Sequence, residues 1–209
     1  MRIDLHVHTY PRSQCSEIDP VALVQEAKKI GLDGICITEH QVLWDKNELR
    51  ELGDSYGIKL FSGNEITTAQ GDILVFGVDT DIQGIITAQK LQKEVQACGG
   101  FSIAAHPFRG FKTFGIGRLN MSLDKAARKK ILQYVDAIEV KNGRVSDNEN
   151  TMARNVSEKL GKIGTVGSDA HTLEQLGTHV MIFNYPLKDE TDLVNALRNG
   201  DFTFGSQRN

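Results

Sequence analysis

The chain has 209 residues, of which 40% are hydrophobic and 24% are charged, and its formal net charge is −3. This length suits one domain with a single continuous core, and the composition is that of a globular protein rather than a disordered or membrane-spanning one. A slightly acidic chain lacks the general basic excess on which non-specific binding to nucleic acid depends.

The cysteines and the N-terminal region indicate the compartment. The three cysteines have no C-x-x-C spacing, and their odd number argues against a complete disulfide framework. No apolar run approaches the roughly 20 residues that a membrane helix needs, and no signal-peptide pattern precedes the first strand-like run. We therefore expect a reduced, cytoplasmic protein with no membrane partner, and the sequence leaves its oligomeric state open.

Short apolar or β-branched runs alternate with amphipathic stretches along the chain. Residues 2–9 alternate apolar and polar side chains as a strand does. Asp19-Pro20 has the order of an N-cap and a first helical residue, and Gly31 ends the helix that follows. Further strands are predicted at 34–40, 59–67, 101–106, 137–141, 163–168 and 180–184, with an added strand or hairpin partner at 72–78. Further helices are predicted at 45–56, 87–97, 123–134, 147–160 and 190–199, with a loop at 107–120.

Seven main strands separated by helices, with no linker or change of composition, predict a single domain over residues 1–209. The expected fold class is α/β, a distorted (β/α)7 barrel of parallel strands that is similar to a TIM barrel. In such barrels the loops that follow the strands share one face and carry the catalytic groups.

Five of the six histidines lie at or next to the end of a strand-like run, which places them at that face. They are His6, His8, His40, His106 and His171. Glu65 ends another run, and Asp169 precedes the last of these histidines by two residues. Neutral imidazole and carboxylate groups are the ligands that hold Zn, Mn or Fe ions. The pattern therefore predicts a site for several metal ions.

The spacing of these residues supports the same interpretation. His6 and His8 are two residues apart, so in a strand both side chains point to the same side and can grip one ion. Asp169 and His171 have the same spacing. Taken alone, each histidine has an ordinary alternative as a core or surface residue, and Glu65 has one as an exposed charge. Their joint occurrence favours the metal site.

The segments DLHVHT, ITEH, GNEITT, AAHPF and GSDAH, in this order, resemble the four motifs and the intervening glutamate of the PHP (polymerase and histidinol phosphatase) family. The resemblance implies a distorted seven-stranded barrel that binds two or three divalent ions and hydrolyses phosphate esters. The implied ligands of the three ions are, in turn, His6, His8, Glu65 and Asp169; Glu65 and His106; and His40 and His171.

The chain departs from the family pattern at two ligand positions. Residues 11–17 offer no Asp or His that matches a ligand of the third ion. No histidine lies between His40 and His106 to serve the second ion, so Asp72 or Asp79 would have to substitute. Glu139, at the end of the strand predicted at 137–141, fits a ligand, a supporting base or a surface carboxylate. We therefore expect two well-occupied ions and leave the third open.

Clustered divalent ions lower the pKa of bound water and neutralise the charge of a phosphate. A hydroxide held between two ions would attack phosphorus in line, with Asp169 among the catalytic groups. His171 or His40 would protonate the leaving oxygen if no third ion occupies them.

Basic residues in the expected loops are candidates for binding the phosphate. A planar guanidinium suits two phosphate oxygens at once, which favours Arg109 and Arg12, and Lys141 is a further candidate. Each of the three has an alternative as a solvated loop charge. The loop at 108–120, rich in Gly and Phe, is a candidate flap over the site.

Three functions fit these residues. The favoured one is a metal-dependent phosphoesterase, or phosphatase, that hydrolyses a small phosphorylated metabolite or nucleotide. No long basic groove or further domain is apparent for a nucleic-acid polymer, which is therefore not the expected partner. The alternatives are a metal-dependent amide or lactone hydrolase and a metal-stabilised regulatory module without catalysis.

Overall fold

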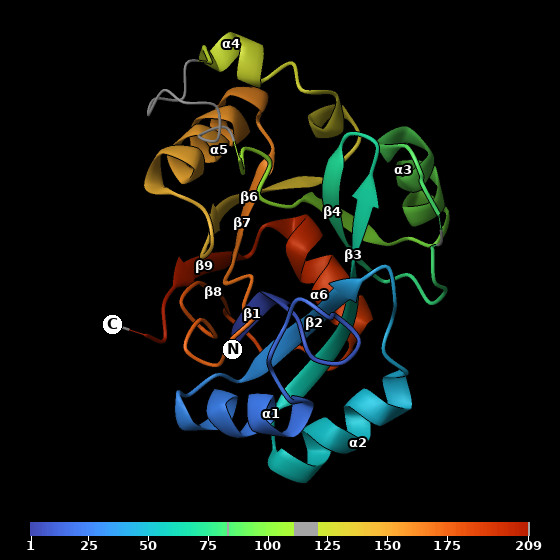
Figure 1. Ribbon diagram of the computed structural model, residues 1–209, viewed down its shortest axis with the longest axis vertical. Coiled ribbons are helices and arrows are strands. Elements are labelled where there is room, and N and C mark those ends of the chain that lie inside the picture. The colour runs from blue at the N-terminus through green and yellow to red at the C-terminus, as the bar shows by residue number, and fades with distance from the viewer. Residues whose placement is uncertain (83, 111–120, 209) are drawn as a thin grey trace.

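The computed structural model describes residues 1–82, 84–110 and 121–208 (Figure 1). Nine strands form one sheet in the order β7-β6-β5-β4-β3-β2-β1-β8-β9. The strands are β1 (Arg2–Val7), β2 (Gly34–His40), β3 (Lys59–Thr68), β4 (Gly71–Phe76), β5 (Phe101–Ala104), β6 (Ala137–Asn142), β7 (Ile163–Gly167), β8 (Val180–Phe183) and β9 (Phe202–Gly205). The helices are α1 (Pro20–Lys29), α2 (Lys46–Tyr56), α3 (Ala88–Ala97), α4 (Leu123–Ala126), a 3-10 turn at Lys130–Gln133, α5 (Asp147–Leu160) and α6 (Glu190–Asn199).

Backbone contacts between the first strand and the segment after β7 nearly close the sheet into a barrel. Val7 forms a parallel bridge with Ala170. The amide of His8 donates to the carbonyl oxygen of Ala170 at 3.0 Å, and the amide of Ala170 donates to that of His6 at 3.2 Å. The first and last histidine motifs therefore lie against each other, although more than 160 residues separate them.

The α/β architecture agrees with the expected fold class, but the strand directions depart from a (β/α)7 barrel. The triplets β1-β2-β3 and β5-β6-β7 are parallel, whereas β4 runs antiparallel to both of its neighbours. Only Ala69 and Gln70 separate β3 from β4, and a parallel crossover needs a dozen or more residues. That short turn requires the hairpin.

The C-terminal part of the sheet also differs from the expectation. β8 pairs antiparallel with β1, and β9, which was not predicted, pairs antiparallel with β8. The helix predicted at 123–134 is divided into α4 and the 3-10 turn. A strand of four residues directly after a helix has too few alternating positions to give a periodic signal.

Local signals in the sequence set the helix ends. The Asp19 carboxylate accepts hydrogen bonds from the amides of Val21 and Ala22, at 2.9 and 3.0 Å, and so caps α1. Gly161 adopts a left-handed conformation, with a φ of 62°, where α5 ends. In the described part of the chain, no helix has the length and apolar character that crossing a membrane would require.

The first strand is buried on both faces. Ile3 and Leu5 lie in the main hydrophobic core, while Asp4, His6 and His8 point to the other face and are also fully buried. Polar groups withdrawn from water need partners, because an unpaired buried charge is strongly unfavourable. The polar side chains of β1 therefore need hydrogen-bond or charge partners inside the barrel.

The close approach of β7 to β1 requires a glycine at position 167. A Cβ added to Gly167 would lie 2.6 Å from the Cβ of His6 and 3.0 Å from Oε1 of Glu139. We expect Gly167→Ala to lower the free energy of unfolding by about 1–3 kcal/mol, since overpacked cores lose that amount. Urea denaturation measures the change.

Gly164→Ala in the same strand is the matched control, because its Cβ would meet the two methyl groups of Val140 at 3.0 and 3.1 Å and Oγ of Ser157 at an ordinary 3.7 Å. These methyl groups have more room to yield than the backbone-anchored Cβ of His6. Equal losses for the two variants would show that the β1–β7 approach is not the constraint.

Candidate metal centre

Glu65, at the end of β3, is the centre of a buried cluster of imidazole rings. Its Oε2 lies 3.5 Å from Nε2 of His6, 3.3 Å from Nε2 of His8 and 3.2 Å from Nδ1 of His40. Its Oε1 lies 2.9 Å from Nε2 of His106. One carboxylate therefore contacts four histidines, which come from the ends of β1 and β2 and from the loop after β5.

Asp169 and His171, just beyond β7, complete the cluster. Oδ1 of Asp169 lies 3.6 Å from Nε2 of both His6 and His8. The ring centroids of His8 and His171 are 4.5 Å apart. The structure thus brings together all five histidines, the glutamate and the aspartate that the sequence singled out.

The donor atoms fit divalent metal ions. Among the residues that the structure describes, three groups have ligand atoms within 4.8 Å of one another: His8, His40 and His171; His6, His8 and Asp169; and His6, Glu65 and His106. Imidazole nitrogens and carboxylate oxygens are suitable ligands for Zn, Mn and Fe. These groups overlap the ligand sets implied by the family resemblance, which assigned Glu65 to two ions.

The charges of the cluster favour a cation. Burial opposes the ionisation of His6, yet the carboxylates of Glu139 and Glu65 raise the pKa of this ring to about 10. Burial also opposes the ionisation of Glu65, but His6 and His106 hold its pKa well below the usual range. Carboxylates that stay ionised in a buried site attract positive charge, which bound metal ions would supply.

Two of the site residues have strained backbones. His106 and Asp169 have φ values of 29° and 56°, in the left-handed region that non-glycine residues seldom adopt. The amide of His106 donates to Oε2 of Glu139 at 2.8 Å, which helps to hold this conformation. Such strain is found where the surrounding structure fixes a side chain in position for function.

Glu139 supports His6 from behind. Its Oε1 lies 3.0 Å from Nδ1 of His6, and its Oε2 also accepts a hydrogen bond from Nδ2 of Asn142 at 2.9 Å. The residue is only 1% exposed, which rules out the alternative of a surface carboxylate. Because it contacts the ring nitrogen that faces away from Glu65, Glu139 orients the histidine.

A second support, which the sequence analysis overlooked, holds His8. Oγ of Ser13 lies 3.4 Å from Nδ1 of His8, accepts from the amide of His40 at 3.2 Å and donates to Glu39. Glu39 is fully buried and also accepts from Nε1 of Trp44 at 3.0 Å. A hydroxyl that accepts from Nδ1–H leaves Nε2 of His8 with its lone pair toward the cluster.

Ser13 lies in residues 11–17, where the family pattern places an Asp or His ligand, and a serine matches neither. Glu39 stands directly before His40 in β2 and therefore points to the other side of the strand. A glutamate next to a site histidine was the available signal.

The basic residues lie at different places. Arg109 donates a hydrogen bond to Oδ2 of Asp169 and so belongs to the site. Arg12 instead pairs with Glu48 at 3.0 Å and lies over the ring of Trp44, 4.2 Å from its centroid. Lys141 is exposed. Most of the candidate flap, residues 111–120, lies outside the described residues.

Arg144, in the loop after β6, was not a candidate from the sequence. Its Nη1 lies 2.8 Å from Nδ1 of His171 and 4.0 Å from Oδ1 of Asp169. Its position two residues after the end of a strand was the signal that could have found it, because loops that follow strands meet at the site.

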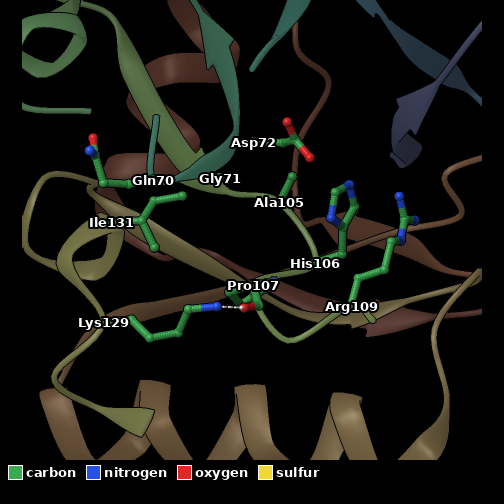
Figure 2. A pocket seen from close by; sticks show the side chains of 9 residues that line it. All are labelled: Gln70, Gly71, Asp72, Ala105, His106, Pro107, Arg109, Lys129 and Ile131. Carbon is green, nitrogen blue, oxygen red and sulfur yellow. Dashed lines mark hydrogen bonds between the residues drawn. The ribbon is translucent and has the colours of Figure 1, made fainter. Parts of the chain in front are cut away.

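The two acidic substitutes proposed for the missing histidine are far from equivalent. Asp72 is half-buried and lines a cavity of about 180 Å3 together with His106 and Arg109 (Figure 2). Asp79 is exposed and pairs with Nζ of Lys46 at 2.5 Å. Of the two carboxylates, only that of Asp72 borders the site.

Two family descriptions match the chain. The PHP domain matches residues 4–105, and the PHP-associated segment matches residues 147–202. An uncharacterized protein of Methanocaldococcus jannaschii is 27% identical over 137 residues, which cover 59% of this chain and 78% of that protein.

Solved structures of low sequence identity share the fold. A two-domain protein from Bacteroides vulgatus, described as containing a predicted PHP-like metal-dependent phosphoesterase, superposes with a TM-score of 0.74 at 22% identity. The match covers 99% of this chain and 64% of that one. A lesion-specific endonuclease from Pyrococcus furiosus has a TM-score of 0.58 at 15% identity, covering 95% of this chain and 56% of that one.

The Ser13 support generates a prediction about metal affinity. Ser13→Ala removes the acceptor that fixes the His8 ring, and we expect the affinity for Mn²⁺ or Zn²⁺ to fall about 10-fold, the lower end for residues that orient metal ligands. Competition with a chelating dye measures the dissociation constant. Ser55→Ala, on the exposed surface of α2, is the control. An unchanged affinity for Ser13→Ala would show that the hydroxyl does not position His8.

Proposed function

The chain belongs to the PHP domain family, and from this membership and the geometry of the site we propose that it is a metal-dependent phosphoesterase. Its proposed substrate is a small phosphorylated metabolite or nucleotide. The observation that carries the proposal is the Glu65 carboxylate in contact with four imidazole rings. A carboxylate so placed can bridge two metal ions, and paired ions are a recurrent device for hydrolysing phosphate esters.

We propose two well-occupied ion positions that share Glu65, with Mn, Zn or Fe as the metal. The ligands of the first are His6, His8 and Asp169 in addition to Glu65, and the second adds His106. Bound divalent ions would lower the pKa of a water molecule and offset the charge of the phosphate.

His40 and His171 suit a third ion better than proton transfer. Burial lowers the pKa of His40. Burial and the nearby His8 and Arg144 lower the pKa of His171 to about 3. Both rings are therefore neutral near pH 7, which is the form that accepts a metal ion rather than the form that gives up a proton. We propose that they act as ligands when a third ion is present.

Arg109 and Arg144 are the proposed phosphate-binding groups. They come from the loops after β5 and β6. Arg109 contacts Oδ2 of Asp169, and Arg144 lies near Oδ1 of the same carboxylate. Their guanidinium side chains are 38% and 39% exposed, which leaves both accessible to a ligand. Guanidinium groups bind phosphate oxygens in pairs. Arg12 and Lys141 have no comparable position next to the cluster.

The size of the substrate is a separate proposal. The similarity to a lesion-specific endonuclease means that the fold does not exclude a nucleic-acid polymer, so the expectation against such a partner is not supported. A small ester remains the proposal because the cavity beside His106 has a volume of only about 180 Å3.

The first experiment tests the reaction itself. The protein is stripped with a chelator and reloaded with Mn²⁺, and phosphate release is measured from sugar phosphates and nucleotides, with an amide and a lactone panel in parallel. We expect release of phosphate that depends on metal. Bound metal with hydrolysis of amides or lactones alone would favour the alternative hydrolase, and bound metal without any hydrolysis would favour the regulatory module.

Glu65→Gln tests the bridging carboxylate. We expect this variant to lose bound metal and to lower kcat/KM by at least about 100-fold, because one anionic ligand of both ions is gone. Metal content by mass spectrometry and turnover are measured on the same preparation. Glu51→Gln, exposed on α2, serves as the control. A variant with full metal content and activity would contradict the proposed centre.

Arg109→Ala and Arg144→Ala test the phosphate-binding groups. Each should raise KM for phosphate esters about 10-fold, the loss expected for one charge-assisted hydrogen bond. The bound metal should stay at the wild-type level. Arg50→Ala, exposed on α2, is the comparison. If KM stays constant in both site variants, the phosphate lies elsewhere.

A further inference from the structure

The cavity of about 180 Å3 opens beside the candidate metal centre and shares two residues with the proposed reaction site (Figure 2). His106 contacts Glu65, and Arg109 contacts Asp169. A water molecule takes about 30 Å3 of liquid volume, so the cavity has room for a small group, on the order of six heavy atoms. A phosphate bound by Arg109 would leave its ester group next to this space.

Asp72, the second residue of β4, supplies the carboxylate among the residues that line this cavity. No described residue donates a hydrogen bond to its carboxylate or forms an ion pair with it, whereas Glu65, Glu139 and Asp169 all have such partners. The carbonyl oxygen of Asp72 accepts from the amide of Ala105 at 3.0 Å, which fixes the backbone. In Figure 2 the carboxylate lies on the same side of the view as the imidazole ring of His106 and the guanidinium group of Arg109. A half-buried carboxylate that accepts no hydrogen bond from a described residue can accept one from a ligand.

The other polar residues of the cavity are engaged in building its wall. Oε1 of Gln70 accepts from the amide of Ala88 at 2.8 Å, where α3 begins. Nζ of Lys129 donates to the carbonyl oxygen of Pro107 at 2.5 Å. Ile131 adds an apolar surface. These contacts make the wall a preformed one, with Asp72 as its anionic group.

The charged groups of the cavity would orient a bound ligand. Asp72 is negative, whereas Arg109, toward the cluster, and Lys129, whose ammonium group donates to the carbonyl oxygen of Pro107, are positive. A phosphate ester would bind with its phosphate at Arg109 and with a neutral or cationic donor at Asp72. A leaving group that carries a second anion would be repelled by the unpaired carboxylate.

We infer that this cavity binds the leaving group of the ester and that Asp72 selects alcohols bearing a hydrogen-bond donor, either a further hydroxyl or an ammonium group. The inference rests on the proposed phosphoesterase function and names the class of its substrate. None of the three ligand groups in the described part of the chain includes Asp72, and the inference gives this carboxylate a role other than the ligand role that the sequence led us to expect.

Three esters of similar size separate the possibilities: glycerol phosphate presents hydroxyl groups, phosphoethanolamine presents an ammonium group, and propyl phosphate presents neither. The Mn²⁺-loaded wild-type protein should hydrolyse one or both of the donor-bearing esters with a kcat/KM at least about 10-fold above that of propyl phosphate, the value of one hydrogen bond to a charged group. In Asp72→Asn this ratio should fall about 10-fold. The ammonium ester should lose more than the hydroxyl ester if the negative charge is what binds it.

Metal content separates this role from metal binding. Asp72→Asn should keep the metal stoichiometry and the thermal unfolding midpoint of the wild type, and Asp79→Asn, in its exposed pair with Lys46, should keep the wild-type substrate ratio. An unchanged ratio in Asp72→Asn overturns the inference, and a loss of metal overturns it in favour of a ligand role. If the metal-loaded wild type hydrolyses none of the three esters or any other phosphate ester, the proposed function fails and the inference fails with it.

Discussion

The contact of one buried carboxylate with four imidazole rings is the interaction on which the rest of this structure depends. Glu65 is withdrawn from water and stays ionised because the rings around it supply positive charge or accept a metal ion. Removing water from so many polar groups is unfavourable unless each finds a partner. The polar interior of the barrel is therefore stable only as a complete set, and a bound cation would complete it.

Closure of the barrel brings the last two members, Asp169 and His171, to the buried cluster around Glu65. The bridge from Val7 to Ala170 places the H-x-H pair of the first strand against the D-x-H pair that follows β7. Gly167 permits this approach, because any larger side chain would meet the Cβ of His6. Stability and the candidate function thus share the same contact between the two ends of the sheet.

Two supports outside the cluster orient its rings. Glu139 holds His6, and the Ser13 hydroxyl, backed by Glu39, holds His8. Both act on the ring nitrogen that faces away from Glu65, and so they set which nitrogen presents its lone pair. A site with mobile rings would bind metal less tightly, since the rings would have to be ordered on binding. The protein itself therefore orients these two rings, without a bound ion.

The sequence by itself determined the candidate ligands, because a spacing of two residues in a strand and a position at its end are local properties that need no knowledge of distant contacts. It also indicated the α/β class and most element boundaries, since caps and periodicity are local too. Only the tertiary structure decided that β8 runs antiparallel to β1, that Arg144 rather than Arg12 reaches the cluster, and that Ser13 and Glu39 support it. Those outcomes depend on which loops meet across the barrel, and the meeting of segments far apart in the chain leaves no periodic or local signal in a single sequence.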